Sequence, residues 1–468
     1  MASDPPRLPR GWGAMRGWST VPPVAPLGGV FVALGAVLLT TRGVATFLAP
    51  RGDGCSPSPL AGHRHAGLGT WRFDAEKWQC SARETPATGV ASARLGSGLG
   101  LLAVLCAACT APLRRSPLRA GQRRPTPCRR HGLQLSALPS LAGISIAGTG
   151  SATPTAIVSN DDLSEVMDTS DEWIVQRTGI KRRHIMKPDE SLVSLSAAAA
   201  RQALQRAGMS AEDVDLVVLA TSTPDDLFGS AAPVAAELGA SKAVAFDLTA
   251  ACSGFVFGLV TAAQYIRSGA ATSVLVIGAD CLSRWVDWSD RSTCVLFGDG
   301  AGAVALRATE PEKDALIGFQ LGSDGHGSRH LGLSGSCAPV PLGGNNQGGA
   351  GTFAPLTMNG KEVFRFATSR VPEVLNSLLA RHNIGNDEID WLLLHQANRR
   401  IMDSAAKRLK LPQEKIICNL DEYGNTSAAS IPLALDEAVV DGRVKPGHLV
   451  ACAGFGAGLS WGGLLLRL

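Results

Sequence analysis

The sequence lacks the signatures of several common kinds of site, and these absences narrow what the protein does. Its one closely spaced cysteine pair, Cys106 and Cys109, has neither a second pair nor histidines nearby, so no metal-binding motif is present. The glycine-rich turn GDGAG at 298–302 lacks the lysine that would follow in a phosphate-binding loop. No feature calls for a bound redox cofactor. The cysteines are dispersed and odd in number, 11 in all, which favours free thiols over a disulfide framework.

An excess of basic over acidic residues is also missing from most of the chain. The net charge of +4 hides an asymmetry: residues 1–140 carry 17 Arg or Lys and 5 acidic residues, whereas the remaining 328 residues carry 27 and 35. A protein that binds nucleic acid does not confine its positive charge to a poorly patterned N-terminus. We therefore expect no nucleic-acid partner, and an acidic, soluble body.

Two apolar runs before residue 141 predict a targeting leader. Val24–Leu39 resembles the core of a signal peptide, and Leu95–Leu113 is an uncharged run of 19 residues followed by Arg114 and Arg115. The second run is a poor buried helix and a marginal membrane span, because of its glycines and its length. The leader is rich in arginine and poor in acidic residues, as transit peptides are, and it resembles the bipartite leaders of algae with secondary plastids. We expect residues 1–140 to direct the protein to the plastid stroma and to be removed, which leaves no membrane segment.

From residue 141 onward the pattern predicts a duplicated α/β fold. Apolar runs typical of buried strands start at Val214, Ser273, Ile389 and His448, and the first and second pairs both span 59 residues. Segments of helical character lie between them at 196–207, 254–267, 363–382 and 400–410. Matching spacing predicts one half over 141–310 and another over 311–468. The candidate site is expected where the strands of such folds end.

Three short runs carry the candidate chemistry. In TAACSGF (249–255), Cys252 opens a predicted helix, whose dipole and free N–H groups favour a thiolate. In LHQAN (394–398) and YGNTSAAS (423–430), His395 and Asn425 each follow an apolar run that indicates a buried strand. Singly, a cysteine is usually an inert buried thiol, a histidine at a strand end a core residue, and an asparagine a turn-former. Together, a thiolate, an imidazole and an amide donor are what Claisen condensation of thioesters requires.

Residues from about 142 to 468 closely resemble the β-ketoacyl-acyl-carrier-protein synthase type III family, and within it the plastid forms. The runs that carry the resemblance are the Cys252 run, TSDEWIVQRTGI (169–180), FGDGAGA (297–303), HQANRRI (395–401) and YGNTSAASIPLALDEAV (423–439). The family is the initiating condensing enzyme of type II fatty acid synthesis. The resemblance implies a thiolase-like, five-layer αβαβα fold, a homodimer and no cofactor, with acetyl-CoA as a substrate.

The resemblance also implies a role for each of the three residues. Cys252 would hold an acetyl group from acetyl-CoA, while His395 and Asn425 would donate hydrogen bonds to the malonyl thioester and stabilise the enolate that forms on decarboxylation. The expected product is acetoacetyl-acyl-carrier protein. An oxyanion hole for the acyl step would combine the N–H of Cys252 with one from the loop Gly454, Phe455, Gly456, Ala457 and Gly458, where glycines permit close backbone approach.

Further contacts are carried over from the family in the same way. Trp173 and Arg291 match the positions that sandwich the CoA adenine, Arg177 and Thr178 match nearby nucleotide contacts, and Asn398 matches a residue that supports the histidine region. Phe228 matches the aromatic that reaches across the dimer to floor the acyl pocket. For Trp173 the alternative is ordinary core packing.

A basic patch beside the expected active-site mouth suits an acidic acyl carrier protein, since the body is acidic overall. Its residues lie on two predicted helices: Arg365, Arg370, Arg399, Arg400, Lys407 and Arg408. The alternative is a solvated helix face. The glycine-rich insertion Ser336–Thr352 departs from shorter bacterial members and is typical of a surface loop. Two other functions stay open: a condensing-fold acyltransferase of specialised metabolism, and a partner subunit that has lost catalysis.

Overall fold

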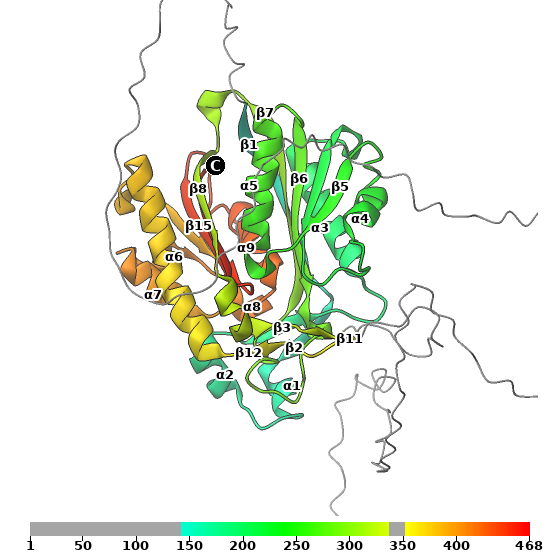
Figure 1. The fold of residues 1–468 in the computed structure, drawn as a ribbon, viewed down its shortest axis with the longest axis vertical. Coiled ribbons are helices and arrows are strands. Elements are labelled where there is room, and N and C mark those ends of the chain that lie inside the picture. Colours follow the sequence, from blue (N-terminus) through cyan, green and yellow to red (C-terminus); the bar gives the residue numbers. More distant parts are fainter. Residues whose placement is uncertain (1–141, 337–351) are drawn as a thin grey trace, which may run out of the picture. The chain divides into compact units, whose positions relative to one another are not determined.

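The computed structural model describes residues 142–336 and 352–468, which are built around two five-stranded sheets (Figure 1). The expected leader and the interior of the Ser336–Thr352 insertion lie outside the described residues. The first sheet contains β1 (Gly143–Ala152), β4 (Leu216–Ala220), β5 (Val244–Leu248), β6 (Ser273–Cys281) and β7 (Asp299–Thr309). The second contains β8 (Leu316–Ser323), β13 (Trp391–Leu394), β14 (Ile416–Ile417), β15 (Leu449–Gly456) and β16 (Ser460–Arg467).

The two sheets have the same strand order. The first is β1-β7-β6-β4-β5 and the second is β8-β16-β15-β13-β14, so corresponding strands occupy corresponding places. The strands β6, β4 and β5 run parallel to one another, as do β15, β13 and β14, whereas β7 and β16 run antiparallel to both of their neighbours. The duplicated α/β fold expected from the repeated spacing is confirmed.

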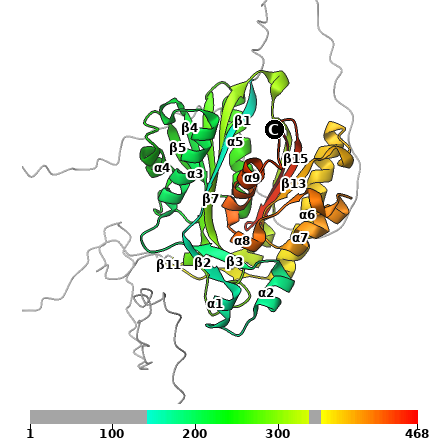
Figure 2. The ribbon, with the colours of Figure 1, turned by 180° about the vertical axis from the view of Figure 1, so that it is seen from behind.

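Helices form the remaining three layers (Figure 1, and from behind in Figure 2). The helices α5 (Gly254–Arg267) and α9 (Ser430–Val440) lie between the sheets. The helices α3 (Leu192–Ala207) and α4 (Ala231–Leu238) cover the outer face of the first sheet, and α6 (Gly360–His382) and α7 (Arg399–Arg408) cover that of the second. This order of layers is the αβαβα arrangement of the expected thiolase-like fold.

The central helices explain why the layers hold together. The helix α5 buries apolar side chains against both sheets, among them Phe255, Leu259 and Ile266, within one cluster that also contains residues of β6 and β15. The helix α9 approaches the first sheet closely at Gly302, where a Cβ atom would lie 2.5 Å from the backbone nitrogen of Leu433. Only glycine allows that approach, so this contact depends on the FGDGAGA run.

The predicted helices agree with the structure to within a few residues. The helix predicted at 254–267 is α5, and those at 196–207, 363–382 and 400–410 are α3, α6 and α7. The helix α3 begins four residues before the predicted start, because the Ser191 side chain caps it in a capping box with Ser194. Cap geometry of this kind is not visible in apolar periodicity.

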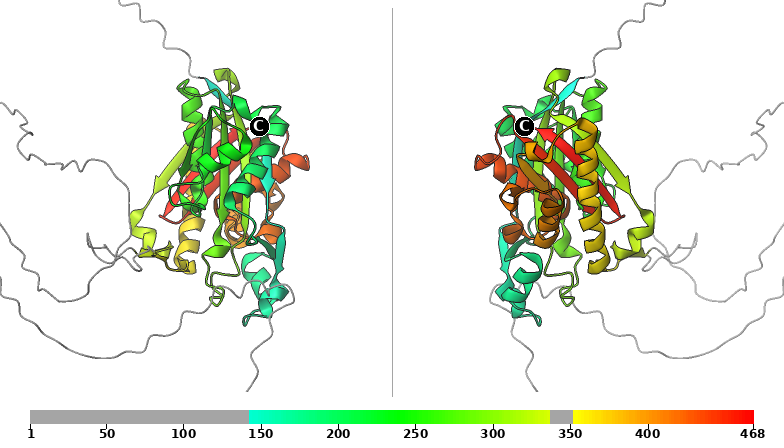
Figure 3. Two further views of the ribbon diagram at one scale, coloured as in Figure 1. Left: turned by 90° about the vertical axis from the view of Figure 1, so that its right-hand side faces the viewer. Right: turned by 90° about the vertical axis from the view of Figure 1, so that its left-hand side faces the viewer.

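Short elements frame one end of the layered core. They are β2 (Ala156–Ser159), α1 (Asn160–Ser164), α2 (Asp171–Thr178), β3 (Arg182–Ile185), β9 (Leu331–Gly332), β10 (Gly335–Ser336), β11 (Thr352–Phe353), β12 (Thr357–Met358) and α8 (Leu420–Tyr423). In Figure 3 the cyan helices α1 and α2 lie opposite the C-terminus, which follows β16. Because β15 runs antiparallel to β16, it ends on the side of α1 and α2.

Three further observations hold for the described residues only. None of their helices combines the length and apolarity that crossing a membrane requires. They contain no cluster of His, Cys, Asp or Glu arranged to hold a metal ion. Their five cysteines are free thiols: Cys252, Cys281, Cys294, Cys418 and Cys452.

Candidate active site

Cys252 lies directly before the central helix α5. It is the middle residue of the short 3-10 helix η3 (Ala251–Ser253), which runs into α5 without a break. The preceding residue, Ala251, has a φ of +47°, a left-handed conformation that is uncommon for a residue other than glycine. The Cys252 side chain is only 7% exposed. The sequence therefore placed this cysteine correctly at a helix start.

The surroundings of Cys252 oppose its ionisation. Burial raises the pKa of the thiol to about 12; the Ser427 hydroxyl, which lies 3.3 Å from the sulfur, acts in the opposite direction, and the Asp280 carboxylate raises the pKa further. This rise corresponds to about 4 kcal/mol, whereas a helix dipole contributes about 0.3–2 kcal/mol. The helix position alone therefore does not produce the expected thiolate. A proton acceptor or an incoming substrate has to contribute.

His395 lies directly after β13, at the mouth of the strand as expected. Its backbone N–H donates to the carbonyl oxygen of Ala453, and its ring Nδ1 lies 2.7 Å from the Ser430 hydroxyl at the start of α9. The ring packs edge-on against Phe455, with 5.1 Å between the ring centroids. Burial lowers the pKa of His395 to about 3, so its imidazole is neutral near pH 7. Since Nδ1 contacts Ser430, Nε2 is the ring nitrogen left to meet a ligand.

The Asn425 side chain is held through its oxygen, and its amide nitrogen has no hydrogen-bond partner among the described residues. Its Oδ1 accepts a hydrogen bond from the Ser427 N–H at 2.9 Å, and its own backbone N–H donates to Leu296 at 2.8 Å. A side-chain amide whose oxygen is engaged still has two N–H donors. The apolar run before Asn425 forms the short buried strand β14 as expected, but the short helix α8 lies between this strand and Asn425.

The expected oxyanion loop spans the end of β15 and the turn that follows. Gly456 comes so close to the nucleophile that a Cβ atom there would lie 2.7 Å from the backbone nitrogen of Cys252. The side chain of any other residue would therefore displace the Cys252 N–H. Phe455, Gly456, Ala457 and Gly458 line the cavity described below, whereas Gly454 packs behind them against Ser253.

One cavity of about 1500 Å³ brings these groups together. Cys252, His395 and Asn425 all line it, although they are far apart in the sequence and come from both halves of the fold. Trp173 of α2 also lines this cavity. Its volume is larger than is usual for a compact ligand, which suits a long, extended one.

The expected nucleotide slot is closed in this structure. The guanidinium carbon of Arg291 lies 4.6 Å from the centre of the Trp173 indole, and that of Arg177 lies 4.3 Å from it. One stacked contact needs about 3.5–4 Å, so no space is left for a purine between Trp173 and Arg291. Arg291 also donates to the backbone oxygen of Asp168. A sandwich of adenine between these two side chains would require Arg291 to move away from the indole.

Thr178, an expected nucleotide contact, and Asn398, expected to support the histidine region, both have hydrogen-bond partners in the structure. The Thr178 hydroxyl donates to the carbonyl oxygen of Ile174 and accepts from the N–H of Ile180. Asn398 caps α7 by accepting from the N–H of Arg400, and its amide donates to the carbonyl oxygen of Arg177. Asn398 therefore connects α2 to the start of α7, just after His395. Both Thr178 and Asn398 line the cavity.

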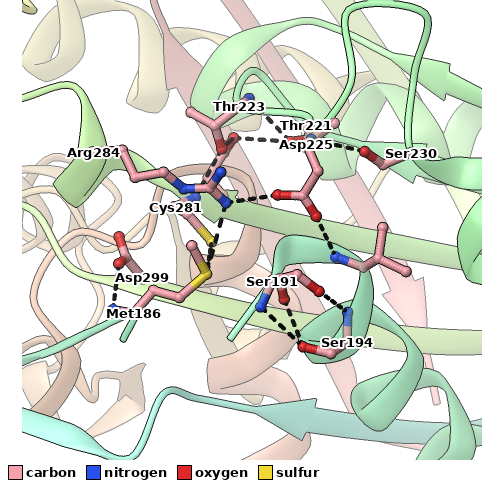
Figure 4. Close-up of polar contacts among 12 residues, drawn as sticks. Met186, Ser191, Ser194, Thr221, Thr223, Asp225, Ser230, Cys281, Arg284 and Asp299 are labelled. Carbon is pink, nitrogen blue, oxygen red and sulfur yellow. Dashed lines mark hydrogen bonds and ion pairs between the residues drawn. The ribbon is translucent and has the colours of Figure 1, made fainter. Parts of the chain in front are cut away.

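Phe228 does not line the cavity of this chain. It is 98% exposed, on the loop between β4 and α4, and its neighbour Leu227, which does line the cavity, is 83% exposed. Figure 4 shows how the loop is held behind these residues: Arg284 donates to the Asp225 carboxylate at 2.8 Å, and the Asp225 N–H donates to Ser230. The base of the loop is fixed while its two large apolar side chains face outward.

Ion pairs neutralise some residues of the basic patch and leave others unpaired. Arg365 pairs with Glu362, Arg370 with Glu373 and Arg399 with Asp403. Within the described part of the chain, Arg400, Lys407 and Arg408 form no ion pair, and all three are exposed. Arg400 also lines the cavity, with its guanidinium 5.5 Å from the Phe364 ring. Within the basic patch, the positive charge that is available to attract a partner therefore lies on α7.

Three polar residues at the site were not singled out from the sequence. Ser430 contacts His395, Ser427 contacts Cys252, and the fully buried Asp280 at the end of β6 lies close enough to Cys252 to affect its pKa. Both serines stand in the run YGNTSAAS, where the alternation of small and hydroxyl residues was the available signal. No sequence signal distinguished Asp280.

The five-layer fold and this cavity define a condensing enzyme of the thiolase superfamily. The sequence matches the family models "3-Oxoacyl-[acyl-carrier-protein (ACP)] synthase III" at residues 246–325 and "3-Oxoacyl-[acyl-carrier-protein (ACP)] synthase III C terminal" at residues 379–468. A "Beta-ketoacyl-[acyl-carrier-protein] synthase III" of Trichormus variabilis is 59% identical over 325 residues, which cover 69% of this chain and 98% of the relative. The chain belongs to the β-ketoacyl-[acyl-carrier-protein] synthase III family.

Solved structures agree with this assignment. The crystal structure of 3-oxoacyl-[acyl-carrier-protein] synthase III from Aquifex aeolicus is 42% identical with a TM-score of 0.63, and covers 70% of this chain and 100% of its own. The priming β-ketosynthase of the R1128 polyketide pathway is 36% identical with a TM-score of 0.65, and covers 71% and 98%. The described fold is thus shared with a 3-oxoacyl-[acyl-carrier-protein] synthase III and with a priming ketosynthase of a polyketide pathway.

Proposed function

We propose that this protein condenses acetyl-CoA with malonyl-acyl-carrier protein, releasing carbon dioxide and forming acetoacetyl-acyl-carrier protein. The observation that carries the proposal is the convergence of Cys252, His395 and Asn425 on one cavity, in a chain 59% identical to a β-ketoacyl-[acyl-carrier-protein] synthase III. The reaction initiates type II fatty acid synthesis. It is redox-neutral and its developing charge is met by hydrogen-bond donors, so the proposal includes no metal or redox cofactor, and acetyl-CoA enters as a substrate.

The first half-reaction transfers the acetyl group. The Cys252 thiolate attacks the thioester carbonyl of acetyl-CoA, and CoA leaves as a thiolate that takes up a proton. Negative charge on the carbonyl oxygen meets the Cys252 N–H and the adjacent backbone of the Gly454–Gly458 loop, where Gly456 makes the close approach possible. Acetyl-Cys252 is the intermediate.

The second half-reaction uses the other two residues. The malonyl thioester oxygen accepts hydrogen bonds from His395 Nε2 and the Asn425 amide, so the enolate left by carbon dioxide is stabilised. The enolate carbon attacks acetyl-Cys252, forms the new carbon–carbon bond and releases the Cys252 thiolate. A neutral His395 and an Asn425 amide with its oxygen already engaged support these donor roles.

The CoA nucleotide is proposed to bind at Trp173, with Arg177, Thr178, Arg291 and Asn398 around it. All five residues line the same cavity as the nucleophile. Because Arg291 stacks on Trp173 in this structure, binding would exchange a guanidinium–indole contact for two contacts with the purine.

A homodimer is proposed through the free edge of the first sheet. The strand β5 is the last strand of that sheet, and its Val244 is 64% exposed. An open edge strand readily pairs with another chain. The exposed Leu227 and Phe228 lie on the loop that leads to α4, next to β5. In the dimer Phe228 would enter the partner's acyl pocket and limit the length of the primer.

Acyl carrier protein is proposed to dock on α7. Arg400, Lys407 and Arg408 are exposed and carry positive charge without an ion-pair partner among the described residues, and Arg365 adds a fourth, partly neutralised charge from α6. Arg400 at the cavity rim would guide the acidic carrier so that its prosthetic arm enters toward Cys252.

A plastid location is proposed for the mature protein. Residues 1–140 have the composition of a transit peptide, and the match to the Trichormus variabilis relative spans 325 residues, 69% of this chain. A fluorescent protein fused behind residues 1–140 should enter the plastid stroma of an algal host and lose the leader. Retention in the cytosol would contradict this location.

The function is tested by incubating the full-length chain with radiolabelled acetyl-CoA and malonyl-acyl-carrier protein. Labelled acetoacetyl-carrier is expected, together with one equivalent of carbon dioxide. A Cys252→Ala variant is the control. If the wild type forms no labelled product, the proposal is wrong. The alternative, an acyltransferase of specialised metabolism, is favoured by the R1128 neighbour and would show preference for a primer other than acetyl-CoA.

A further inference from the structure

Arg183 carries a buried charge to which the proposed mechanism gives no role. It lies on β3, and its side chain is among the largest of those that are fully buried. Burial lowers the pKa of its guanidinium to about 10, so the group is still protonated near pH 7. Among the described residues it forms no ion pair, and its Nε has no hydrogen-bond partner. A charge is costly to bury without a counter-ion, so the contacts that hold this one point to a function.

The guanidinium joins the strands β2 and β3 to a segment 112 positions further along the chain. Its Nη1 donates to the carbonyl oxygen of Val158 in β2 at 3.2 Å and to Oδ1 of Asn160 in α1 at 2.9 Å. Its Nη2 donates to the carbonyl oxygen of Val295 at 2.8 Å. Because a guanidinium is a rigid, planar fork, these bonds on its two sides fix the distance between the two parts of the chain.

The segment 295–298, whose first carbonyl oxygen binds Arg183, holds Asn425. The Asn425 N–H donates to the carbonyl oxygen of Leu296 at 2.8 Å, and the Asn425 carbonyl oxygen accepts from the Gly298 N–H at 3.1 Å. The two stretches thus pair like short parallel strands. Since both backbone polar groups of Asn425 are bonded to this segment, the place of the Asn425 side chain in the cavity depends on the place of the segment.

The aliphatic part of Arg183 packs against both stretches of this pair. A Cβ atom on Gly298 would lie 3.2 Å from the Cβ atom of Arg183, and one on Gly424, the residue before Asn425, would lie 3.5 Å from it. The same side chain therefore contacts the pair through its stem and binds it through its charged end. This packing is independent of the hydrogen bonds and supports the same role.

The opposite side of the guanidinium has a firm support. Asn160 is buried, and its Nδ2 donates to Oδ1 of Asp171 at 2.8 Å and to the carbonyl oxygen of Ile180 at 2.7 Å. Asp171 is the first residue of α2, the helix that bears Trp173. The bonds from α2 through Asn160 and Arg183 to the segment 295–298 are therefore continuous.

A fixed point is needed here because the segment that holds Asn425 follows a side chain that has to move. Backbone hydrogen bonds make residues 290–296 one continuous turn, with Arg291 near its start. The 4.6 Å between Arg291 and the Trp173 ring leaves no room for a purine, so nucleotide binding displaces Arg291. Arg183 binds this turn close to its other end, between Arg291 and the residues that hold Asn425.

We propose that Arg183 positions Asn425 for decarboxylation of the malonyl thioester, by fixing the segment 295–298 to which the Asn425 backbone is bonded. Arg183 touches no substrate in this role. It keeps the Asn425 amide aimed at the thioester oxygen while Arg291 moves with the nucleotide. The role rests on the proposed function, because it concerns the second half-reaction, and it leaves acetyl transfer to Cys252 unaffected.

The test compares the two half-reactions in the full-length Arg183→Met protein. Methionine fills much of the same space without charge and removes the bridge to Val295. Release of labelled carbon dioxide from malonyl-carrier should fall in kcat between about 10- and 100-fold, since a displacement of about 1 Å at a reacting group costs about 100-fold. Acetylation of Cys252 at saturating acetyl-CoA, measured by mass spectrometry, should change little.

A double-mutant cycle shows whether Arg183 acts through Asn425. If it does, adding Arg183→Met to an Asn425→Ala protein should lower decarboxylation little further, because the group that Arg183 positions is already gone. Losses that multiply in the double variant would overturn the proposal. A general loss of structure also multiplies, so this measurement separates positioning from folding.

Two further variants control for the loss of a buried arginine. Arg183→Lys keeps the charge but not the fork, so it should show a smaller loss of the same kind. Arg267→Met removes a partly buried arginine that binds Asp314 and the carbonyl oxygen of Leu316 outside the cavity, and both half-reactions should stay at the wild-type rates.

The outcomes distinguish this role from the proposed function. Equal loss of both half-reactions in Arg183→Met and Arg183→Lys would mean that Arg183 supports the whole cavity, and the proposal would be wrong. Unchanged decarboxylation in Arg183→Met would overturn it too, as would a selective loss of decarboxylation in Arg267→Met. A wild type that accepts acetyl but releases no carbon dioxide from malonyl-carrier would instead overturn the proposed function.

Discussion

The Nδ1 atom of His395 lies 2.7 Å from the hydroxyl of Ser430, a residue at the first turn of the central helix α9. This contact joins the end of β13 to a helix of the middle layer and leaves Nε2 for the substrate. If Ser430 donates to Nδ1, the proton of the neutral ring is on Nε2, which is the donor that enolate stabilisation requires.

Ser430→Ala should therefore impair the donor role of His395. We expect kcat for condensation to fall about 10-fold, the size of one lost hydrogen bond, while acetyl transfer from acetyl-CoA to Cys252 changes little. Single-turnover assays of the two half-reactions measure the difference. Ser430→Thr, which keeps the hydroxyl, is the matched control, and equal losses in both half-reactions would contradict the role.

Cys252→Ser should abolish both acyl-enzyme formation and condensation, because a buried serine hydroxyl does not ionise near neutral pH. Intact-protein mass spectrometry after incubation with acetyl-CoA should show the mass of one acetyl group on the wild type and none on the variant. Cys418→Ser, at a thiol outside the cavity, should be acetylated like the wild type. An acetylated Cys252→Ser protein would exclude Cys252 as the acyl carrier.

His395→Ala and Asn425→Ala should separate the two half-reactions. Each variant is expected to accept acetyl from acetyl-CoA but to lose malonyl decarboxylation by about 100- to 1000-fold, as is usual when one oxyanion donor is removed. Release of labelled carbon dioxide from malonyl-carrier measures the loss. The reverse pattern, with acetyl transfer lost and decarboxylation intact, would exchange the proposed roles.

The buried His395 should also make the protein less stable in acid. Its folded-state pKa of about 3 lies below the ordinary 6.5, so between these values the unfolded chain binds a proton that the folded chain does not. Stability contributed by keeping the ring neutral is full above pH 6.5 and falls by about 1.4 kcal/mol per pH unit below it. Chemical denaturation of His395→Gln between pH 4 and 7 should show a shallower decline than the wild type. Identical slopes would contradict the buried neutral ring.

The sequence predicted the main elements because their signals are local. Continuous apolar runs predicted β4, β6, β13 and β15. The small residues before an apolar helix predicted that Cys252 lies at a helix start. The apolar run before Asn425 forms β14 as expected, but the sequence did not reveal that the helical turn α8, with the buried Leu420, separates this strand from Asn425. A short apolar run does not distinguish a buried strand from a helical turn.

The rest of the site could not be predicted because it depends on contacts across the fold. Asp280 accepts a hydrogen bond from Ala428, which is 148 positions away in the chain, and no sequence pattern predicts this contact. The closed stacking of Arg291 on Trp173 is likewise a property of packing. The same holds for the basic patch, where ion pairs with acidic neighbours decide which charges remain available.

That division of charge gives the last prediction. Converting Arg400, Lys407 and Arg408 to glutamate should raise KM for malonyl-acyl-carrier protein about 10-fold, which corresponds to about 1.4 kcal/mol, and leave acetyl transfer from acetyl-CoA nearly unchanged. Converting Lys313, Arg381 and Lys445, exposed residues that do not line the cavity, changes the net charge equally and should have little effect. Exposed charges steer encounter and are screened by salt. High ionic strength should therefore raise the KM of the wild type for the carrier, as the α7 substitutions do. If neither the α7 variant nor salt alters carrier kinetics, α7 presents only a solvated face and the carrier docks elsewhere.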